Sequence, residues 1–175
     1  MKLIPIYTEI VKDRQNHTIF LDEKTRFTYK AYHKEPSQRF YWIGFFSFLF
    51  FMREMQQLNL SFSNTVNIGL IIAVIVLGLI SGKYFYKKFT YEEIKEIYLT
   101  ESMIEDYVEE GERVFKLELW IAAICLISFL FLIILFIFTS SFVLLIFSYL
   151  ALVFFKVYLY RLPKERFRLY KRSTN

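Results

Sequence analysis

The sequence predicts an α-helical integral membrane protein with four transmembrane helices, a small cytoplasmic β-meander at the N-terminus and short cytoplasmic amphipathic helices between spans two and three. Three observations lead to this fold class. The chain holds a run of 37 residues without Asp, Glu, Lys or Arg, from Leu119 to Phe155. Two shorter apolar stretches precede that run, and the basic residues gather in alternate connecting segments.

The uncharged run predicts two antiparallel spans, at residues 119–138 and 141–160. One bilayer crossing needs about 20 apolar residues at a rise of 1.5 Å per residue. The polar break Thr139-Ser140-Ser141 lies near the middle of the run and supplies the reversal. A soluble domain of 175 residues needs no such segment, so we expect the protein to be integral to a membrane.

The two earlier spans are predicted at residues 40–60 and 66–86, and the later of these is continuously apolar over most of its length. The first is less regular, because Phe40–Met52 is uncharged but short. A full crossing has to include Arg53 and Glu54, with the Arg53 side chain reaching the lipid headgroups. A re-entrant or interfacial aromatic helix is the alternative for this stretch.

The orientation follows from the positions of the basic residues. Of 22 Lys and Arg, only Arg53 lies toward a connection between span one and span two or between span three and span four, and the other 21 lie in the N-terminal region, the central loop, the C-terminal tail or the helix ends beside them. The positive-inside rule then places both termini and the central loop in the cytoplasm, which requires an even number of spans. Frequent Phe, Ile, Tyr and Lys, with only five Ala, suggest a low-GC bacterium. The expected location is therefore the bacterial plasma membrane, and the net charge of +5 needs no nucleic-acid partner.

Residues 1–39 are predicted to form a cytoplasmic β-rich segment. Its strand formers are Ile4, Ile6, Ile10, Thr18, Ile19, Phe20, Phe27, Thr28 and Tyr29. Polar turns at 13–16 and 22–24 divide them into a meander of two or three strands, and Pro36 ends the extended stretch. So small a sheet is marginal alone, and we expect it to lean on the central loop, the membrane surface or a partner protein.

The cytoplasmic loop at residues 87–118 is predicted to contain two short amphipathic helices. Thr90–Glu93 and Ser102–Glu105 both have the spacing of a capping box, and apolar residues follow each at helical spacing. The first stripe is Ile94, Ile97 and Tyr98; the second is Ile104, Tyr107 and Val108. The second helix can merge into span three, and Gly111 is a candidate break or bend.

This loop is also strongly acidic, with ten Asp and Glu between residues 91 and 118 against three basic residues. One interpretation is a dock for a basic partner or a divalent cation. The favoured interpretation is a solvated helix face balanced by the chain's own basic tail at residues 161–175. That tail can also pair with anionic lipid headgroups, so membrane lipid is an expected partner.

No catalytic, cofactor-binding or metal-binding residue is predicted. The buried hydroxyls, Ser47, Ser128 and Ser148, have no histidine in any span to activate them. His17 and His33 lack Cys or carboxylate residues at metal-ligand spacing, which is typical of surface or strand histidines. The five glycines are too scattered for a phosphate-binding loop. We therefore do not expect an enzyme. A proton-coupled transporter is not expected either, because it needs a membrane-buried carboxylate and the apolar cores of the predicted spans contain none.

The candidate interface consists of small residues in span two. Gly69 and Ala73 are four residues apart, as are Gly78 and Gly82. Small residues at this spacing let helices approach closely, and the two pairs lie on opposite sides of the helix. Packing within the chain's own bundle is the favoured interpretation. The alternative is that one groove stays open for a transmembrane partner.

The N-terminal region resembles a known family. The resemblance is carried by Ile6-Tyr7-Thr8-Glu9-Ile10, Thr18-Ile19-Phe20-Leu21-Asp22 and Phe27-Thr28-Tyr29, followed by Pro36 and an aromatic first span. In this pattern, over residues 4–52, the chain is similar to the tandem five-transmembrane proteins of low-GC Gram-positive bacteria. The resemblance implies a membrane immunity protein that shields its producer from a membrane-directed toxin of a type VII secretion system. The four spans predicted here depart from five, and no residue roles carry over.

A small polytopic protein without catalytic residues is expected to act by binding. The leading hypothesis is an immunity protein that neutralises a pore-forming or type VII-secreted toxin, or a bacteriocin, by binding it within the bilayer. The alternative is an accessory or assembly subunit of a larger membrane complex, such as a transporter or secretion system. In either case we expect the protein partner to bind the chain within the bilayer or from the cytosol. The sequence also leaves open whether the chain forms a homo-oligomer.

Overall fold

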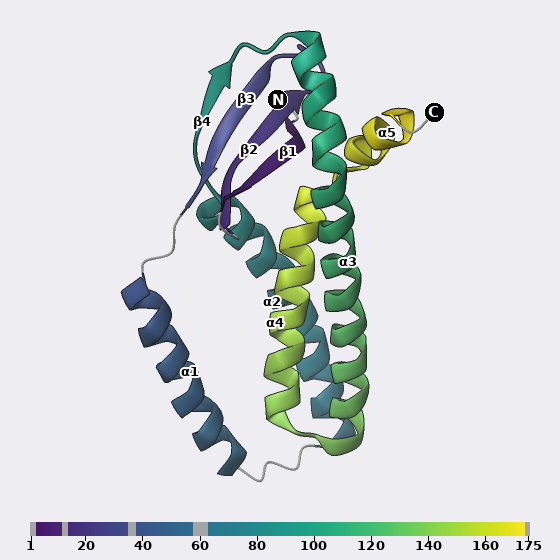
Figure 1. Ribbon diagram of the computed structural model, residues 1–175. Coiled ribbons are helices and arrows are strands. Elements are labelled where there is room, and N and C mark those ends of the chain that lie inside the picture. The colour runs from purple at the N-terminus through teal and green to yellow at the C-terminus, as the bar shows by residue number, and fades with distance from the viewer. Residues whose placement is uncertain (1–2, 12–13, 35–37, 58–62, 174–175) are drawn as a thin grey trace. The chain divides into compact units, whose positions relative to one another are not determined.

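The computed structural model describes residues 3–11, 14–34, 38–57 and 63–173. The elements, in chain order, are β1 (Leu3–Val11), β2 (Arg14–Asp22), β3 (Thr28–His33), α1 (Gln38–Gln57), α2 (Asn64–Phe89), β4 (Tyr91–Ile97), α3 (Glu101–Thr139), α4 (Phe142–Arg161) and α5 (Lys164–Ser173) (Figure 1). The prediction of a mostly helical chain with an N-terminal antiparallel sheet is confirmed. Pro36, the predicted end of the extended stretch, lies outside the described residues.

The chain forms two compact units, each assembled from separate stretches of sequence. The sheet unit contains Met1–Lys34, Tyr84–Ala122 and Val157–Asn175. The bundle unit contains Glu35–Lys83 and Ala123–Lys156. The helices α2, α3 and α4 contribute residues to both units.

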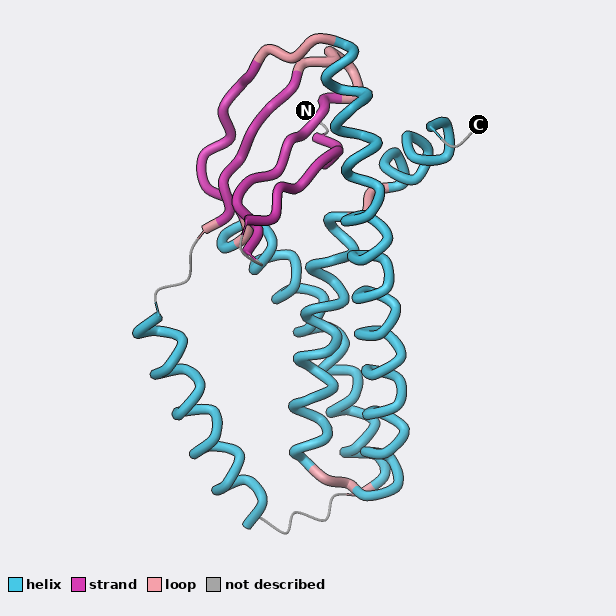
Figure 2. The backbone as a smooth tube through the Cα atoms, viewed as in Figure 1, coloured by secondary structure: helices cyan, strands magenta, loops and turns pink. Residues whose placement is uncertain are grey.

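The sheet has four antiparallel strands in the order β1-β2-β3-β4 (Figure 2). The first three strands form the predicted meander. The turn between β2 and β3 is held by Asp22, whose carboxylate accepts a hydrogen bond from the Lys24 backbone nitrogen at 3.1 Å. Arg26 closes this turn with a positive φ of 57°. The polar residues at 22–24 thus form the turn that their composition predicts.

The fourth strand corrects the prediction for the central loop. Residues Tyr91–Ile97, expected to form the first amphipathic helix, are strand β4 and pair with β3. Ile94 lies opposite Ala31, and Ile97 lies opposite Thr28. A short segment with few apolar residues fits both helical and strand periodicity, and here an adjacent strand decides in favour of the sheet. The central loop is therefore one support on which the meander leans.

Helix α3 begins directly after this strand and runs for 39 residues. The second predicted amphipathic helix is present and merges into the membrane helix, as expected. Its cap differs, because the Thr100 hydroxyl, two residues before Ser102, accepts a hydrogen bond from the Met103 backbone nitrogen at 3.4 Å. Gly111 neither breaks nor ends the helix, which corrects the expectation of a break there.

The core of the sheet unit lies between the sheet and two helices. Ile6, Ile19 and Leu21 form its buried centre. Side chains of α3 and of α5 pack against this centre: Ile104, Tyr107, Val108 and Leu169. The apolar stripe predicted for the second loop helix is thus the stripe that covers the sheet.

In the bundle unit, a tight turn at Ser140 and Ser141 joins α3 to α4. Ser140 has a φ of 51°, and its backbone nitrogen donates to the Phe136 carbonyl at 2.8 Å. Such a left-handed residue is typical of a helix C-terminus. The predicted polar reversal is therefore the observed hairpin turn.

Three helices are long and apolar enough to cross a membrane: α2, α3 and α4. Only about a fifth of the most apolar window of each is buried within the protein (17%, 17% and 22%), which leaves most of their apolar surface for lipid or partner helices. These helices are compatible with a multi-pass membrane protein. The first predicted span, at residues 40–60, overlaps α1, which is not one of these three helices in the described part of the chain. Arg53 and Glu54 interrupt its apolar sequence.

Candidate functional site

The four predicted interface residues do not form one site. Gly78 and Gly82 are buried against α4. A Cβ added to Gly78 would lie 2.7 Å from Leu152 Cδ2, and one added to Gly82 would lie 2.5 Å from Lys156 Cβ. These glycines let α2 and α4 approach closely.

The other pair faces away from this contact. A Cβ added to Gly69 would meet no described atom within 4 Å. Ala73 is exposed as well. Within the described residues, the chain therefore fills one small-residue face of α2 and leaves the other open.

Two hydrogen bonds join α2 to the hairpin formed by α3 and α4. Asn67 is only 6% exposed, and its side-chain nitrogen donates to the Ser140 hydroxyl at 2.9 Å. Tyr149 donates its hydroxyl hydrogen to Ser81 at 2.8 Å. The sequence pattern gives no signal for this role of Asn67.

The sheet unit contains a buried ionic cluster that sequence reasoning also missed. Glu118, Arg161 and Arg166 are 0%, 5% and 0% exposed. Glu118 pairs with both arginines, through Arg161 Nη2 at 2.7 Å and Arg166 Nη1 at 2.5 Å. The three residues come from α3, the end of α4 and α5. Part of the expected balance between acidic loop and basic tail is therefore a buried structural contact.

Aromatic rings and polar groups surround the two guanidinium groups. Arg166 lies 5.3 Å from the ring centroid of Phe115 and 5.8 Å from that of Tyr170. Its Nη1 also donates to the Arg161 carbonyl at 2.9 Å. Arg161 Nη1 donates to the Gln15 side chain of β2 at 2.8 Å. One cluster thus ties α3, α4 and α5 to the sheet.

A signal for part of this cluster exists in the sequence. Glu118 and Arg161 lie 22 and 21 residues from Ser140, on either side of the turn. In an antiparallel helical hairpin, residues at equal distance from the turn stand at the same level along the two helices. An acidic and a basic residue at these positions predict an ion pair. Nothing comparable in the sequence identifies Arg166.

The two histidines lie on strands β2 and β3, each beside a polar side chain. His17 Nδ1 lies 2.9 Å from a Glu9 carboxylate oxygen. His33 Nε2 lies 2.8 Å from the Thr18 hydroxyl. Burial, and to a smaller extent the nearby Arg161 charge, lowers the pKa of His33 to about 4. His33 is therefore neutral near pH 7, which suits a structural hydrogen bond.

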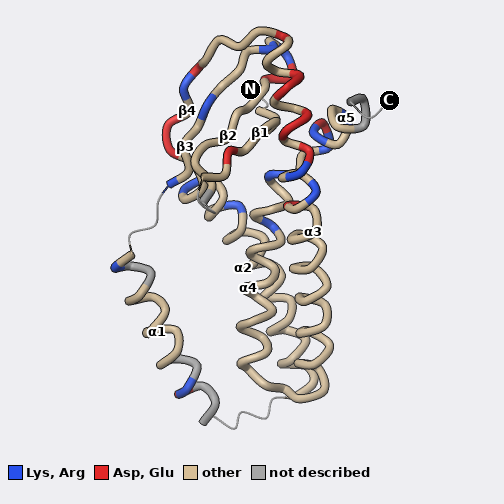
Figure 3. Tube along the Cα trace, in the orientation of Figure 1, with Lys and Arg blue, Asp and Glu red and all other residues tan. Residues whose placement is uncertain are grey.

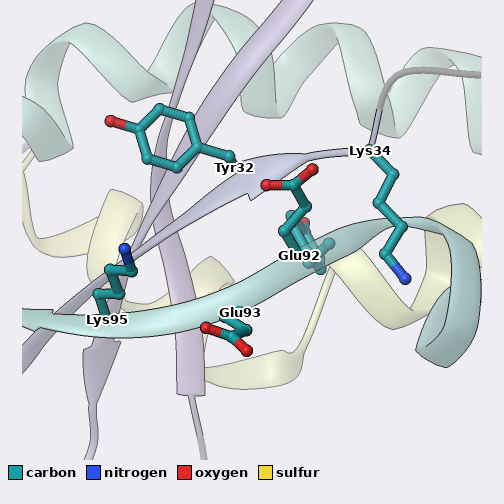
Figure 4. A pocket seen from close by; sticks show the side chains of 6 residues that line it. Tyr32, Lys34, Glu92, Glu93 and Lys95 are labelled. Atoms are coloured by element: carbon teal, nitrogen blue, oxygen red, sulfur yellow. The ribbon is translucent and has the colours of Figure 1, made fainter.

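The surface of the sheet unit is acidic along α3 and β4 (Figure 3). The exposed acidic residues are Glu92, Glu93, Glu96, Glu101, Glu105, Asp106, Glu109 and Glu110. An open hollow of about 480 Å³ lies beside β3 and β4 and is lined by Tyr32, Lys34, Tyr91, Glu92, Glu93 and Lys95 (Figure 4). In the described part of the chain, no three His, Cys, Asp or Glu residues are grouped to hold a metal ion.

The fold therefore defines a class of protein: three long apolar helices, compatible with membrane crossing, carrying a four-stranded antiparallel sheet. Comparison with protein-family models, with curated proteins and with solved structures finds no match.

Proposed function

We propose that this protein is a membrane immunity protein. It crosses the bacterial plasma membrane four times, keeps both termini in the cytoplasm and neutralises a membrane-directed toxin by binding it within the bilayer. The observation that carries the proposal is the open Gly69–Ala73 face of α2. The four-span topology is supported by contacts within the sheet unit, and the mode of binding is supported by the open face of α2.

The pairing of β3 with β4 supports four spans. Because His33 lies opposite Tyr91 in the sheet, these residues are on the same side of the membrane. The chain between them must then cross the membrane an even number of times. Helix α2 is long and apolar enough for one crossing, and we propose that α1 makes the other. Its 20 residues extend about 30 Å, the thickness of the hydrocarbon core.

The ionic cluster supports the same arrangement for the second half of the chain. Glu118 and Arg166 are bonded within the sheet unit, so the segment between them also crosses an even number of times. The hairpin of α3 and α4 provides these two crossings. The basic residues of the sheet unit favour a cytoplasmic location for it under the positive-inside rule.

The topology predicts which positions react with a membrane-impermeant maleimide in intact cells. In a Cys125→Ser background, we expect Asn64→Cys at the start of α2 to be labelled from outside. Tyr98→Cys, at a position that is 90% exposed beside β4, should be labelled only after the cells are permeabilised. Equal labelling of both cysteines in intact cells would contradict four spans.

The open face of α2 supports intramembrane binding. Small residues on a span allow a partner helix to approach the backbone closely, and such packing is a main source of affinity between helices in lipid. Gly78 and Gly82 cannot serve a partner because α4 occupies their face. Gly69 and Ala73 are free of the chain's own described helices, so they are the positions at which a toxin helix is expected to bind.

A co-culture experiment tests this mechanism. A strain lacking the gene is grown with its wild-type parent, and survivors are counted after complementation with each variant. We expect Gly69→Leu/Ala73→Leu to lose protection, because added bulk lowers affinity about tenfold or more. Ala123→Leu, which adds the same side chain at another exposed position in a membrane helix, should protect like the wild type.

The outcomes separate the function from the mechanism. Survival of the deletion strain beside a parent that kills an unrelated strain would rule out immunity. Co-purification with a transporter or secretion complex at fixed stoichiometry would then support the accessory-subunit alternative. Full protection by Gly69→Leu/Ala73→Leu, at equal membrane abundance, would leave immunity standing but reject binding at this face.

A further inference from the structure

The two edge strands of the sheet differ in whether another element packs against them. At the β1 edge, α5 packs against the strand, and Tyr170 donates its hydroxyl hydrogen to the Ile6 carbonyl at 2.6 Å. At the β4 edge, the strand pairs only with β3 among the described residues. The five central residues of β4 are all exposed. The sheet therefore has one closed edge and one open edge.

An open edge is a template for another strand. Its unpaired backbone N–H and C=O groups can bind an extended segment by main-chain hydrogen bonds, with alternate side chains giving specificity. Strand β4 offers seven residues for such pairing. Ile94, at its centre, is 47% exposed and provides an apolar contact on one side of the strand.

The charges of β4 favour a basic partner strand. It carries Glu92, Glu93 and Glu96 against Lys95. If a second copy paired here in full antiparallel overlap about Ile94, Glu92 would lie opposite Glu96 twice and Glu93 would lie opposite Lys95 twice, so the unfavourable and favourable charge pairs would offset each other. A strand with Lys or Arg at alternate positions would instead place opposite charges beside these carboxylates.

The hollow beside β4 leaves room for side chains of such a strand. It has a volume of about 480 Å³ and is bordered by Glu92, Glu93 and the ring of Tyr32. Figure 4 shows Glu92 and Glu93 projecting to opposite sides of β4. A basic side chain on one face of a docked strand would therefore lie on the same side of the sheet as Glu92, and a basic side chain on the other face would lie on the same side as Glu93.

We infer that β4 is a docking edge for an extended, Lys- or Arg-rich segment of a partner protein, which adds a fifth strand to the sheet. This inference lies outside the membrane-spanning helices and does not depend on the immunity proposal. The partner is defined by its chemistry: an extended backbone that pairs with β4 and basic side chains that face Glu92 and Glu96.

A synthetic peptide tests the inference directly. A fluorescent peptide that alternates Lys with Val is titrated into the full-length protein in lipid nanodiscs at low salt, and anisotropy is recorded. We expect saturable binding that weakens as salt is added. Glu92→Gln/Glu96→Gln should lower the affinity about tenfold. Glu105→Gln/Glu109→Gln, which removes the same charge from exposed positions on α3, should change it less than twofold.

Backbone pairing is tested separately from charge. The same peptide with N-methyl groups on alternate residues keeps its charges but cannot form the main-chain hydrogen bonds, and we expect it to lose most of its affinity. Equal binding of the two peptides, or equal effects of the two double variants, would overturn the inference in favour of diffuse electrostatic attraction. Absence of binding, with the protein dimerising through β4, would assign the edge to a second copy instead.

Discussion

Glu118→Gln is expected to destabilise the folded protein by about 3 to 5 kcal/mol, because the substitution leaves two arginines buried without their shared carboxylate. Glu118 is 0% exposed and contacts both Arg161 and Arg166. Water cannot replace it as a counter-charge. In thermal unfolding of the detergent-solubilised protein, a loss of this size corresponds to a decrease in Tm of about 10 °C for a chain of this length.

Two further variants make this result specific. Glu112→Gln removes a carboxylate from the same helix, but Glu112 is partly exposed and pairs with Lys116 at 2.8 Å, so the Tm of this variant should change little. The triple variant Glu118→Leu/Arg161→Met/Arg166→Met removes all three buried charges and should recover much of the stability. A small effect of Glu118→Gln would show that the cluster is solvated in solution.

The long apolar helices could be predicted because their signal lies in adjacent residues. The run from Leu119 to Phe155 contains no charge, and its polar break is the observed turn. Length and hydropathy are local properties, so they need no knowledge of the rest of the fold. The assignment of α1 is harder, since Arg53 and Glu54 weaken the local signal and the support for a crossing comes from the β3–β4 pairing instead.

Strand β4 could not be predicted in this way, because its conformation depends on a distant strand. Ile94 and Ile97 fit a helical stripe, and Thr90 fits a helix cap. The decisive contact is with β3, which lies more than 50 residues earlier in the chain and is separated from β4 by α1 and α2. Local patterns that suit two structures are decided by tertiary pairing.

The ionic cluster shows the same limit for the site. Arg166 belongs to the basic tail that the sequence predicts to balance the acidic loop, yet it is completely buried. Its burial follows from the docking of α5 against β1 and from the rings of Phe115 and Tyr170. Likewise, the spacing of Gly69, Ala73, Gly78 and Gly82 indicates two small faces, but only the position of α4 decides which face is filled.

Gly111→Ala is the second substitution expected to have a large effect. A Cβ at this position would overlap the Ile6 carbonyl oxygen and the Tyr170 hydroxyl, which are themselves hydrogen bonded at the closed edge of the sheet. Gly111 therefore lies where α3, β1 and α5 meet most closely. We expect a loss of about 1 to 3 kcal/mol, despite the gain of about 1 kcal/mol in helix propensity from Gly to Ala.

Gly69→Ala is the matched control, because it makes the same change in another helix where the added Cβ meets open space. At this position the substitution changes only the helix propensity, so the variant should be as stable as the wild type or more stable by up to about 1 kcal/mol. The two substitutions are thus expected to shift Tm in opposite directions. Stabilisation by Gly111→Ala would mean that β1 and α5 do not approach α3 as closely as this structure shows. In that case the closed edge of the sheet, and with it the contrast with β4, would be lost.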